Sequence, residues 1–154
     1  MSLERIAKKY VATITPEATV QDAAKMMREL HVGDVIIVKP GLELGTSAPI
    51  GILTDRDIIV STVAFGVDPK TVLVKDVMSL NLTTAKITDS VFHVINLMKE
   101  NGIKRIPLID SEGTLVGILS ADDLIGMLAS EMTDISKIIE QQRNVEFVRR
   151  RRLA

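Results

Sequence analysis

The sequence of 154 residues contains no cysteine and no tryptophan, and it has only one tyrosine and three phenylalanines. Without cysteine the chain has no disulfide, no thiolate metal ligand and no thiol nucleophile. Because aromatic residues make up 3% of the chain and hydrophobic residues 46%, its core must be built from aliphatic side chains and methionine. The composition therefore excludes a disulfide-stabilised scaffold and cysteine-based catalysis.

Long apolar runs are also missing. The longest, Val35–Val38, has four residues, whereas a helix that crosses a bilayer needs about 20. Charged residues interrupt the amino-terminal stretch at Glu4, Arg5, Lys8 and Lys9, so we expect no secretory leader. The formal net charge of −1 gives no general attraction for polyanions. We expect a cytoplasmic protein with no membrane association.

One motif occurs twice in the chain. The first signature, Gly51–Asp57, reads Gly-Ile-Leu-Thr-Asp-Arg-Asp, and the second signature, Gly117–Asp123, reads Gly-Ile-Leu-Ser-Ala-Asp-Asp. The two copies lie 66 residues apart, and each precedes an apolar run. Such self-similarity indicates a duplicated unit. The chemistry that both copies share is one hydroxyl followed three residues later by one carboxylate.

The pattern around each signature predicts the same order of elements, β-α-β-β-α. In the first half we expect strands and helices over residues 10–15, 20–27, 35–38, 50–53 and 57–66. In the second half we expect them over residues 82–85, 91–101, 106–109, 115–119 and from 123 onward. A lead-in helix is expected over residues 3–9 and a loop over residues 39–49. The predicted fold class is mixed α/β (α+β), with two units packed as a pseudo-symmetric pair.

These elements predict the division of the chain. The first repeat covers residues 7–67, a linker and entry segment covers residues 68–81, and the second repeat covers residues 82–130. Residues 131–154 are expected to form a basic carboxy-terminal helix. Since a unit of about 60 residues buries too little surface to be stable alone, the two repeats should pack on each other.

The two units resemble a tandem pair of cystathionine-β-synthase (CBS) domains, also called a Bateman module, over about residues 7–130. The resemblance rests on unit length, element order, both signatures and the family-typical Lys-Asp-Val-Met-Ser at Lys75–Ser79. Residues 51–57 and 103–110 are similar to small stand-alone bacterial members. The resemblance implies a homodimeric, non-enzymatic module that requires no cofactor. It would bind AMP, ADP or ATP, or alternatively S-adenosylmethionine or NAD, between the paired units and would regulate a protein partner.

The resemblance also implies which residues would bind the ligand. Asp57 and Asp123 would hold the ribose, with the hydroxyls of Thr54 and Ser120 nearby. Four residues would line the adenine pockets, namely Thr13, Ile14, Thr84 and Ala85. The buried strands would form the other wall, through Val35, Ile36, Ile106 and Pro107.

The cations near these positions differ between the repeats. Lys104 and Arg105 lie where the family often has phosphate contacts, whereas the aligned positions of the first repeat are Gly33–Asp34, whose carboxylate would repel a phosphate. Arg56 of the first signature is replaced by Ala121 in the second. We expect Arg56, Lys104 and Arg105 to converge on a central cleft. We also expect the nucleotide to occupy the cleft of the second signature, with Lys104 or Arg105 near its phosphates.

Alternative interpretations remain open for the signatures and the tail. Both signatures also match helix capping boxes, which need no ligand. Arg149–Arg152 fit a solvated helix end, a dimer-locking helix, or a basic surface. The competing function is therefore a ligand-free protein-interaction or nucleic-acid-binding protein acting through this tail, although no aromatic residues interleave its arginines. His31 and His93 have no ligand or triad partners at suitable spacing, so we expect no metal site and no catalytic residue.

Overall fold

The computed structural model describes residues 2–41 and 43–152, and within these it describes all side chains except those of residues 144 and 147–152. The chain divides into two compact units, Met1–Leu119 and Ser120–Ala154. The first unit contains the strands of two small sheets and the helices that cover them, and the second consists almost entirely of one helix.

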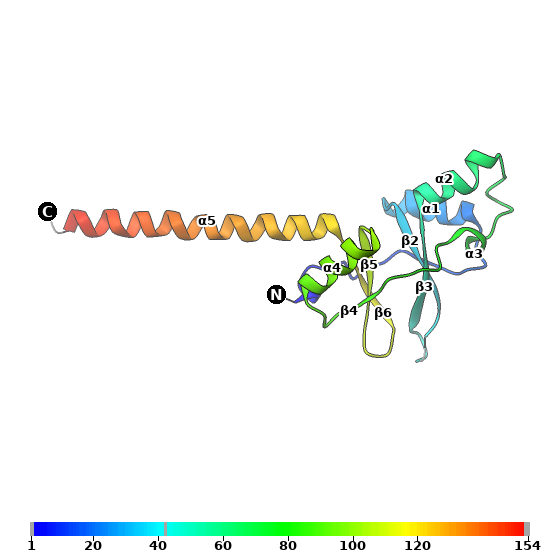
Figure 1. The fold of residues 1–154 in the computed structure, drawn as a ribbon, viewed down its shortest axis with the longest axis horizontal. Helices are drawn as coiled ribbons and strands as arrows, with labels where there is room; N and C mark the ends of the chain where they lie inside the picture. Colours follow the sequence, from blue (N-terminus) through cyan, green and yellow to red (C-terminus); the bar gives the residue numbers. More distant parts are fainter. Residues whose placement is uncertain (1, 42, 153–154) are drawn as a thin grey trace. The chain divides into compact units, whose positions relative to one another are not determined.

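The helices and strands follow the same order in both repeats (Figure 1). The first repeat and the segment after it contain η1 (Leu3–Arg5), β1 (Thr13–Ile14), α1 (Val20–Leu30), β2 (Asp34–Pro40), β3 (Ser47–Thr54), α2 (Asp55–Ser61), η2 (Val63–Phe65) and α3 (Val74–Val77). The second contains β4 (Ala85–Lys86), α4 (Val91–Asn101), β5 (Arg105–Ile109), β6 (Leu115–Ser120) and α5 (Ala121–Arg152).

Each repeat forms a three-stranded sheet, in the orders β1-β2-β3 and β4-β5-β6. In the first sheet β1 runs parallel to β2 and β2 antiparallel to β3, and in the second sheet β4 runs parallel to β5. The predicted fold class, two β-α-β-β-α units of mixed α/β type, is therefore confirmed.

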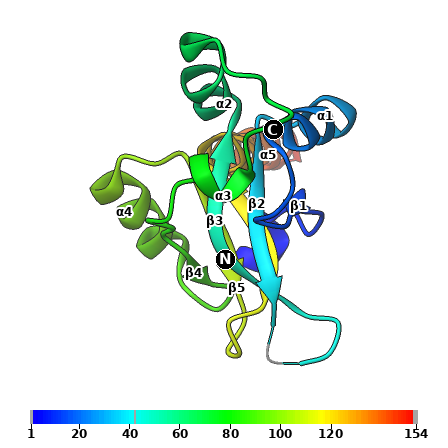
Figure 2. The ribbon, with the colours of Figure 1, turned by 90° about the vertical axis from the view of Figure 1, so that its right-hand side faces the viewer.

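Helix α1 shows why these residues fold as they do. Thr19 and Asp22 form a reciprocal capping box at its start, as the sequence predicted. The residues at helical spacing, Val20, Ala23 and Met27, are buried, so one face of α1 is removed from water. Figure 2 shows α1 beside β2 and α2 beyond the end of β3. Each aliphatic side chain buried in this way contributes about 1.5–3 kcal/mol.

The core is aliphatic, as the composition predicted. The core cluster of the first repeat joins α1, the three strands and α3 through Ile14, Ala23, Met27, Val35, Ile37, Leu53 and Val74. Among the described side chains no aromatic residue is buried. Tyr10, Phe65 and Phe92 are instead exposed at their positions.

The first strand of each repeat is shorter than predicted. Residues 10–12 and 82–84 lie outside β1 and β4, which contain two residues each. The cause lies just upstream in the chain, because Lys8 and Ser79 form β-bridges with strands of the opposite repeat. Each of these segments pairs first with a strand of one sheet, and only the few residues that follow can then pair with β2 or β5 of the other sheet.

The predicted loop over residues 39–49 is mostly strand. Strand β2 continues to Pro40 and β3 begins at Ser47. The prolines were misleading because Pro49 lies on the edge strand, opposite Val38 and beside a register shift. An edge strand at such an irregularity tolerates a residue without a backbone N–H.

Two predicted helices also differ from the structure. The lead-in over residues 3–9 is only the 3-10 turn η1. The helix predicted over residues 57–66 begins at Asp55, ends at Ser61 and is followed by η2. Gly66 ends this stretch with φ of 66°, a left-handed conformation that glycine adopts without steric cost.

Helix α5 extends without interruption over 32 residues, from Ala121 to Arg152. The tail predicted over residues 131–154 is therefore the continuation of the helix that follows the second signature, and its last two residues lie outside the described part. Within the described residues, none of the helices combines the length and apolar character needed to cross a membrane.

Candidate functional site

Two β-bridges join each repeat to the segment that enters the other. Ile52 and Ser79 exchange backbone hydrogen bonds, with N···O distances of 3.3 and 2.9 Å. Lys8 and Ile118 do the same, at 3.0 Å in both directions. Ile118 is the counterpart of Ile52 in the second signature, and Lys8 is the counterpart of Ser79 at the offset of 71. The two repeats thus pack as a pseudo-symmetric pair.

These bridges explain the glycine that begins each signature. A Cβ atom at Gly51 would lie 2.9 Å from the carbonyl oxygen of Ser79, and one at Gly117 would lie 3.1 Å from that of Lys8. Any side chain at either position would push the entering segment away from the strand. Both glycines therefore permit a close approach of two backbones.

A cavity of about 380 Å³ opens beside the first bridge. The first signature, the entering segment and the turn before β5 together line it, through Ile52, Thr54, Arg56, Ser79, Asn81, Leu82, Thr83, Gly102, Ile103, Lys104 and Arg105. Its size lies within the range of small-molecule sites. The cleft therefore combines the signature of one repeat with the strand entries of the other.

The hydroxyl and carboxylate of the first signature form a complete capping box at the start of α2. The Thr54 backbone N–H and hydroxyl donate to Asp57 Oδ2 at 2.9 and 2.7 Å. The Asp57 backbone N–H donates to Thr54 Oγ1 at 3.2 Å. The capping interpretation is thus confirmed. Because all contacts of the box to this carboxylate use Oδ2, the box leaves Oδ1 for another donor.

The second signature repeats this arrangement at the start of α5. The Ser120 backbone N–H donates to Asp123 Oδ2 at 3.0 Å, and the Asp123 backbone N–H donates to Ser120 Oγ at 3.2 Å. The Ser120 hydroxyl also donates to Asp123 Oδ2. Both residues belong to the second compact unit. The shared chemistry of the two signatures is therefore, at the least, helix capping.

Three cations line the cleft of the first signature. Arg56, Lys104 and Arg105 were expected to converge on one cleft, and all three line this cavity. The sequence-based assignment grouped Lys104 and Arg105 with the second signature, whereas the structure places them beside Thr54. The bridge between Ile52 and Ser79 causes this exchange, because it brings the entry of the second repeat to the first signature.

Arg105 also forms an ion pair with its own counterpart in the first repeat. Its Nε lies 2.9 Å from Asp34 Oδ1, and the two positions are related by the offset of 71. Asp34 is 8% exposed, whereas 37% of the Arg105 side chain is exposed. The sequence predicted that the Asp34 carboxylate would repel a phosphate. That prediction left out the guanidinium of Arg105, which pairs with this carboxylate and offsets its negative charge.

The charges around Asp34 act on its pKa in opposite directions. Burial, the largest effect, raises the pKa of Asp34 above its ordinary value of 3.8. The positive charges of Arg105 and Lys8 lower it, while the carboxylate of Asp55 raises it further. The net result is a raised pKa, so the folded chain binds a proton at Asp34 more tightly than the unfolded chain does.

This raised pKa predicts how stability depends on pH. The contribution of Asp34 is fully present below about pH 3.8 and is lost as the pH rises through the pKa of the folded state. An Asp34→Asn variant cannot titrate at this position. The melting temperature of the wild type relative to this variant should therefore fall as the pH is raised from about 3.8 towards neutrality. Thermal melts of both proteins across this range measure the two melting temperatures. A wild-type melting temperature that rises relative to that of Asp34→Asn as the pH is raised would contradict the assignment.

The other predicted site residues lie mostly in the core. Ile14 and Val35 belong to the core cluster, and the buried residues of the other strand positions are Ile36, Ala85, Ile106 and Pro107. Thr84 is half-buried and directly follows Thr83, which lines the cleft. Thr13 lines a separate cavity of about 310 Å³ with Tyr10 and Thr114.

Sequence reasoning missed most of the lining from the entering segment. Ser79, Asn81 and Thr83 belong to or follow a stretch that was predicted to be a linker. No local pattern marks these residues, because their role depends on pairing with a strand about 27 residues away. One sequence feature did point to the partner of Asp34, because Arg105 occupies the aligned position in the second repeat.

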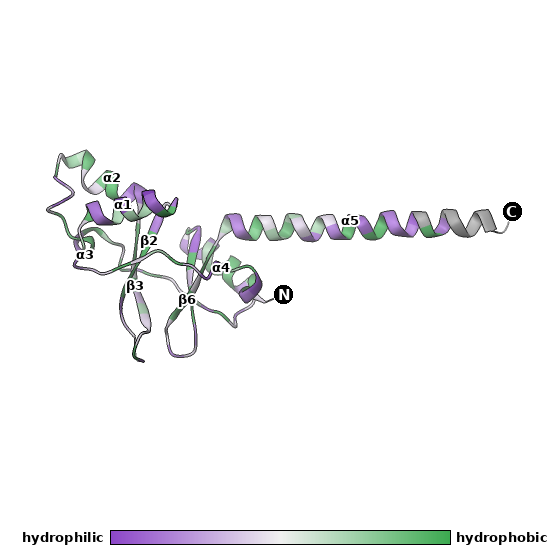
Figure 3. Cartoon of the chain, turned by 180° about the vertical axis from the view of Figure 1, so that it is seen from behind, coloured by the Kyte–Doolittle hydropathy of each residue, from purple (hydrophilic) through white to green (hydrophobic). Residues whose placement is uncertain are grey.

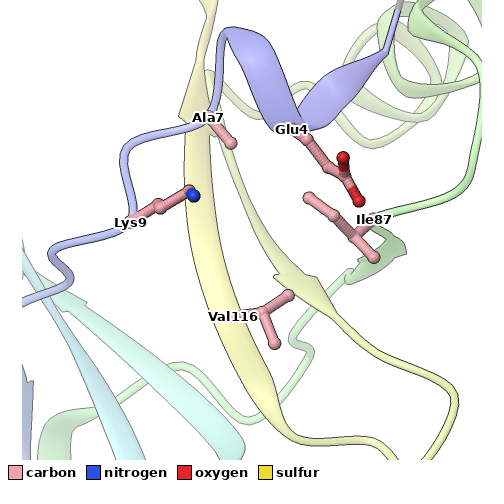
Figure 4. Close-up of a pocket in the computed structure, with 5 residues that line it drawn as sticks. All are labelled: Glu4, Ala7, Lys9, Ile87 and Val116. Carbon is pink, nitrogen blue, oxygen red and sulfur yellow. The ribbon is translucent and has the colours of Figure 1, made fainter.

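A further cavity of about 330 Å³ lies between the amino-terminal segment and the second sheet. Figure 4 shows Glu4, Ala7 and Lys9 on that segment, facing Ile87 and Val116. Its two charged residues are exposed to solvent. Within the described residues, no group of three or more histidine or acidic side chains is placed to hold a metal ion.

Comparison with known proteins agrees with this architecture. The family described as CBS domain matches residues 3–62 and 74–130. The chain is 34% identical over 125 residues to the uncharacterized protein MK0525 of Methanopyrus kandleri, a match that covers 81% of this chain and 61% of that protein. It is 38% identical to the CBS domain-containing protein YhcV of Bacillus subtilis, with 74% of this chain and 76% of that protein covered.

Solved structures share the fold. The hexameric CBS-CP12 protein from bloom-forming cyanobacteria superposes with a TM-score of 0.68 at 32% identity, covering 81% of this chain and 69% of that one. Protein PAE2072 of Pyrobaculum aerophilum, complexed with AMP, gives 0.69 at 22% identity, covering 80% and 90%. The CBS domain pair of protein MJ0100, in complex with 5′-methylthioadenosine and S-adenosyl-L-methionine, gives 0.72 at 24% identity, covering 85% and 98%.

Proposed function

The chain belongs to the CBS-domain family, and from this premise we propose that it is a regulatory module that binds an adenine nucleotide in the cleft of the first signature. AMP, ADP and ATP are the ligands that we favour, and S-adenosylmethionine and NAD are the alternatives. Binding would alter how the module acts on a protein partner. The proposal gives the chain no catalytic step.

The observation that carries this proposal is the composition of the cleft. Three cations from two repeats, Arg56, Lys104 and Arg105, line a single cavity next to a threonine at a helix start. Cations in this arrangement suit the phosphates of a nucleotide. The aliphatic side chains of Ile52 and Ile103 on the same walls suit the faces of a purine.

Asp57 does not itself line the cavity but directly follows Arg56, which does, and in this proposal it supplies the acceptor for the ribose. Its Oδ2 accepts the hydrogen bonds of the capping box, and its Oδ1 is outside that box. A carboxylate oxygen accepts charge-assisted hydrogen bonds from ribose hydroxyls, each worth about 1.5–3 kcal/mol. The capping box then orients the carboxylate that binds the sugar, so the two interpretations of the signature are compatible.

We also propose that the module acts as a homodimer. Four apolar residues after the first signature are exposed in the single chain, namely Ile59, Val60, Val63 and Phe65. They lie within seven residues along α2 and η2, and a group of exposed large apolar side chains of this kind is typical of a protein interface. The arginines at 149–152 have side chains outside the described part, and the competing proposal that they bind nucleic acid is left to experiment.

A ligand screen tests the proposed function. Thermal shift and calorimetry over adenosine, AMP, ADP, ATP, NAD, S-adenosylmethionine and a short DNA duplex would compare all the candidates on the intact chain. We expect a saturable response to at least one adenine nucleotide. A response to DNA alone, with affinity that falls steeply as salt is raised, would instead favour the basic tail.

Lys104 should distinguish ligands by their phosphates. Its side chain is exposed at the rim of the cleft, so a contact to a phosphate is worth about 1 kcal/mol. Lys104→Ala should therefore weaken ATP binding about fivefold and leave adenosine binding unchanged. Calorimetry with both ligands measures this, and Lys99→Ala on α4 serves as the matched surface control. Equal losses for both ligands would place Lys104 outside the phosphate site.

A further inference from the structure

Helix α5 carries a regular apolar seam beyond the end of the second repeat. The seam consists of residues spaced alternately by three and four positions: Ile125, Leu128, Met132, Ile135 and Ile139. All five side chains are exposed, by 51% to 71%. In Figure 3 hydrophobic and hydrophilic residues alternate along α5. This spacing is the a/d pattern of a coiled coil.

The side of the helix opposite the seam is polar, whereas the exposed Ile138 flanks the seam. Ser130, Thr133, Asp134 and Lys137 occupy positions away from the seam, and Lys137 Nζ lies 2.9 Å from Asp134 Oδ1. A helix with one apolar stripe and a polar opposite face is stable in water only when the stripe is covered. The pattern therefore calls for one partner helix.

The charge distribution of α5 indicates what that partner is. Residues 121–140 contain five acidic residues and one lysine, whereas residues 141–152 contain five arginines and one glutamate. Two copies of the helix that run in opposite directions would each place Arg143 beside the acidic start of the other, which contains Asp122 and Asp123. We propose that α5 pairs with α5 of a second copy of this chain as an antiparallel coiled coil.

A parallel pair has the same apolar seam but unfavourable ends. The a/d positions that follow Ile139 are Gln142, Glu146 and Arg149. In a parallel pair each of these would face its own copy, and the two arginine runs would lie side by side. Like charges at such positions oppose association, so the parallel orientation is disfavoured.

One register of the antiparallel pair brings most of the seam together, with Ile125 facing Gln142 of the partner subunit. Leu128 then faces Ile139 of the partner subunit, and Met132 faces the partner's Ile135. At the edge of the same pairing Asp122 faces Arg143 of the partner subunit, which adds an opposite-charge contact. This pairing needs no ligand in the cleft, so it is independent of the proposed nucleotide site.

Engineered cysteines test both the pairing and its direction, because the natural chain has none. The double variant Leu128→Cys/Ile139→Cys should form disulfide-linked dimers under mild oxidation. The single variants should not, since equal positions in the antiparallel pair are 11 residues apart along the helix axis, or about 16 Å. The same spacing prevents a bond within one chain. Efficient cross-linking of each single variant would show a parallel pair, and no cross-linking of any variant would overturn the proposed pairing.

A substitution on the seam provides the control for specificity. In the double-cysteine chain, adding Ile135→Asp should reduce the yield of cross-linked dimer at least tenfold. Adding Ser130→Asp, on the polar face of the same helix, should leave the yield unchanged. Circular dichroism of both variants checks that the repeats remain folded. Equal yields from both variants would overturn the proposed seam.

Discussion

Asp57→Ala is expected to remove most of the rise in melting temperature that an adenine nucleotide produces. A ligand at 100 times its dissociation constant stabilises the native state by about 2.7 kcal/mol. For a chain of this size that corresponds to a shift of about 5–10 °C. The variant lacks the proposed acceptor for the ribose hydroxyls, so the shift should shrink to a small fraction of this value in a thermal melt.

The chain offers a matched control for this experiment. Asp22 occupies the same place in the capping box of α1 that Asp57 occupies in that of α2. The variants Asp57→Ala and Asp22→Ala each lose part of a capping box and should melt at a lower temperature without ligand. For Asp57→Ala the loss of stability should be about 1 kcal/mol. Only Asp57→Ala should lose the response to nucleotide. If both variants keep the full response, Asp57 is a helix cap and the proposed site is wrong.

Arg105→Met is expected to destabilise the apo protein by about 2–3 kcal/mol. The substitution keeps much of the apolar stem but leaves the carboxylate of Asp34 buried without its partner. Breaking a fully buried pair costs about 3–5 kcal/mol, and the partial exposure of Arg105 reduces this value. The melting temperature should fall by about 5–10 °C.

Two further variants separate the ion pair from other effects. Arg56→Met changes another cation of the same cleft, on an exposed side chain, and should shift stability by less than about 0.5 kcal/mol. The double variant Asp34→Asn/Arg105→Met should regain most of the stability, because no charge is then left buried alone. A double variant as unstable as the sum of the two single variants would show that Arg105 contributes through packing and not through Asp34.

The sequence was sufficient for the features that depend on local pattern. The repeated signature gave the duplication, and helical spacing from Val20 to Met27 gave the buried face of α1. The hydroxyl and carboxylate three residues apart predicted each capping box, which the structure contains. These features need only neighbours within about four residues along the chain, so the sequence states them directly.

Only the tertiary structure decided which residues share a cleft. The sequence assigned Lys104 and Arg105 to the signature of their own repeat, whereas they lie beside Thr54 of the other repeat. The bridge between Ile52 and Ser79 produces this exchange, and residues that far apart leave no periodic trace of their pairing.

The ion pair between Asp34 and Arg105 was decided in the same way. The sequence aligns the two positions as equivalents, and equivalents are not expected to touch unless they lie near the pseudo-symmetry axis. Packing of the two repeats brings them within 2.9 Å. Periodicity fixes which face of an element is buried, but the position of the axis depends on how the two buried surfaces fit together, and no single element contains that information.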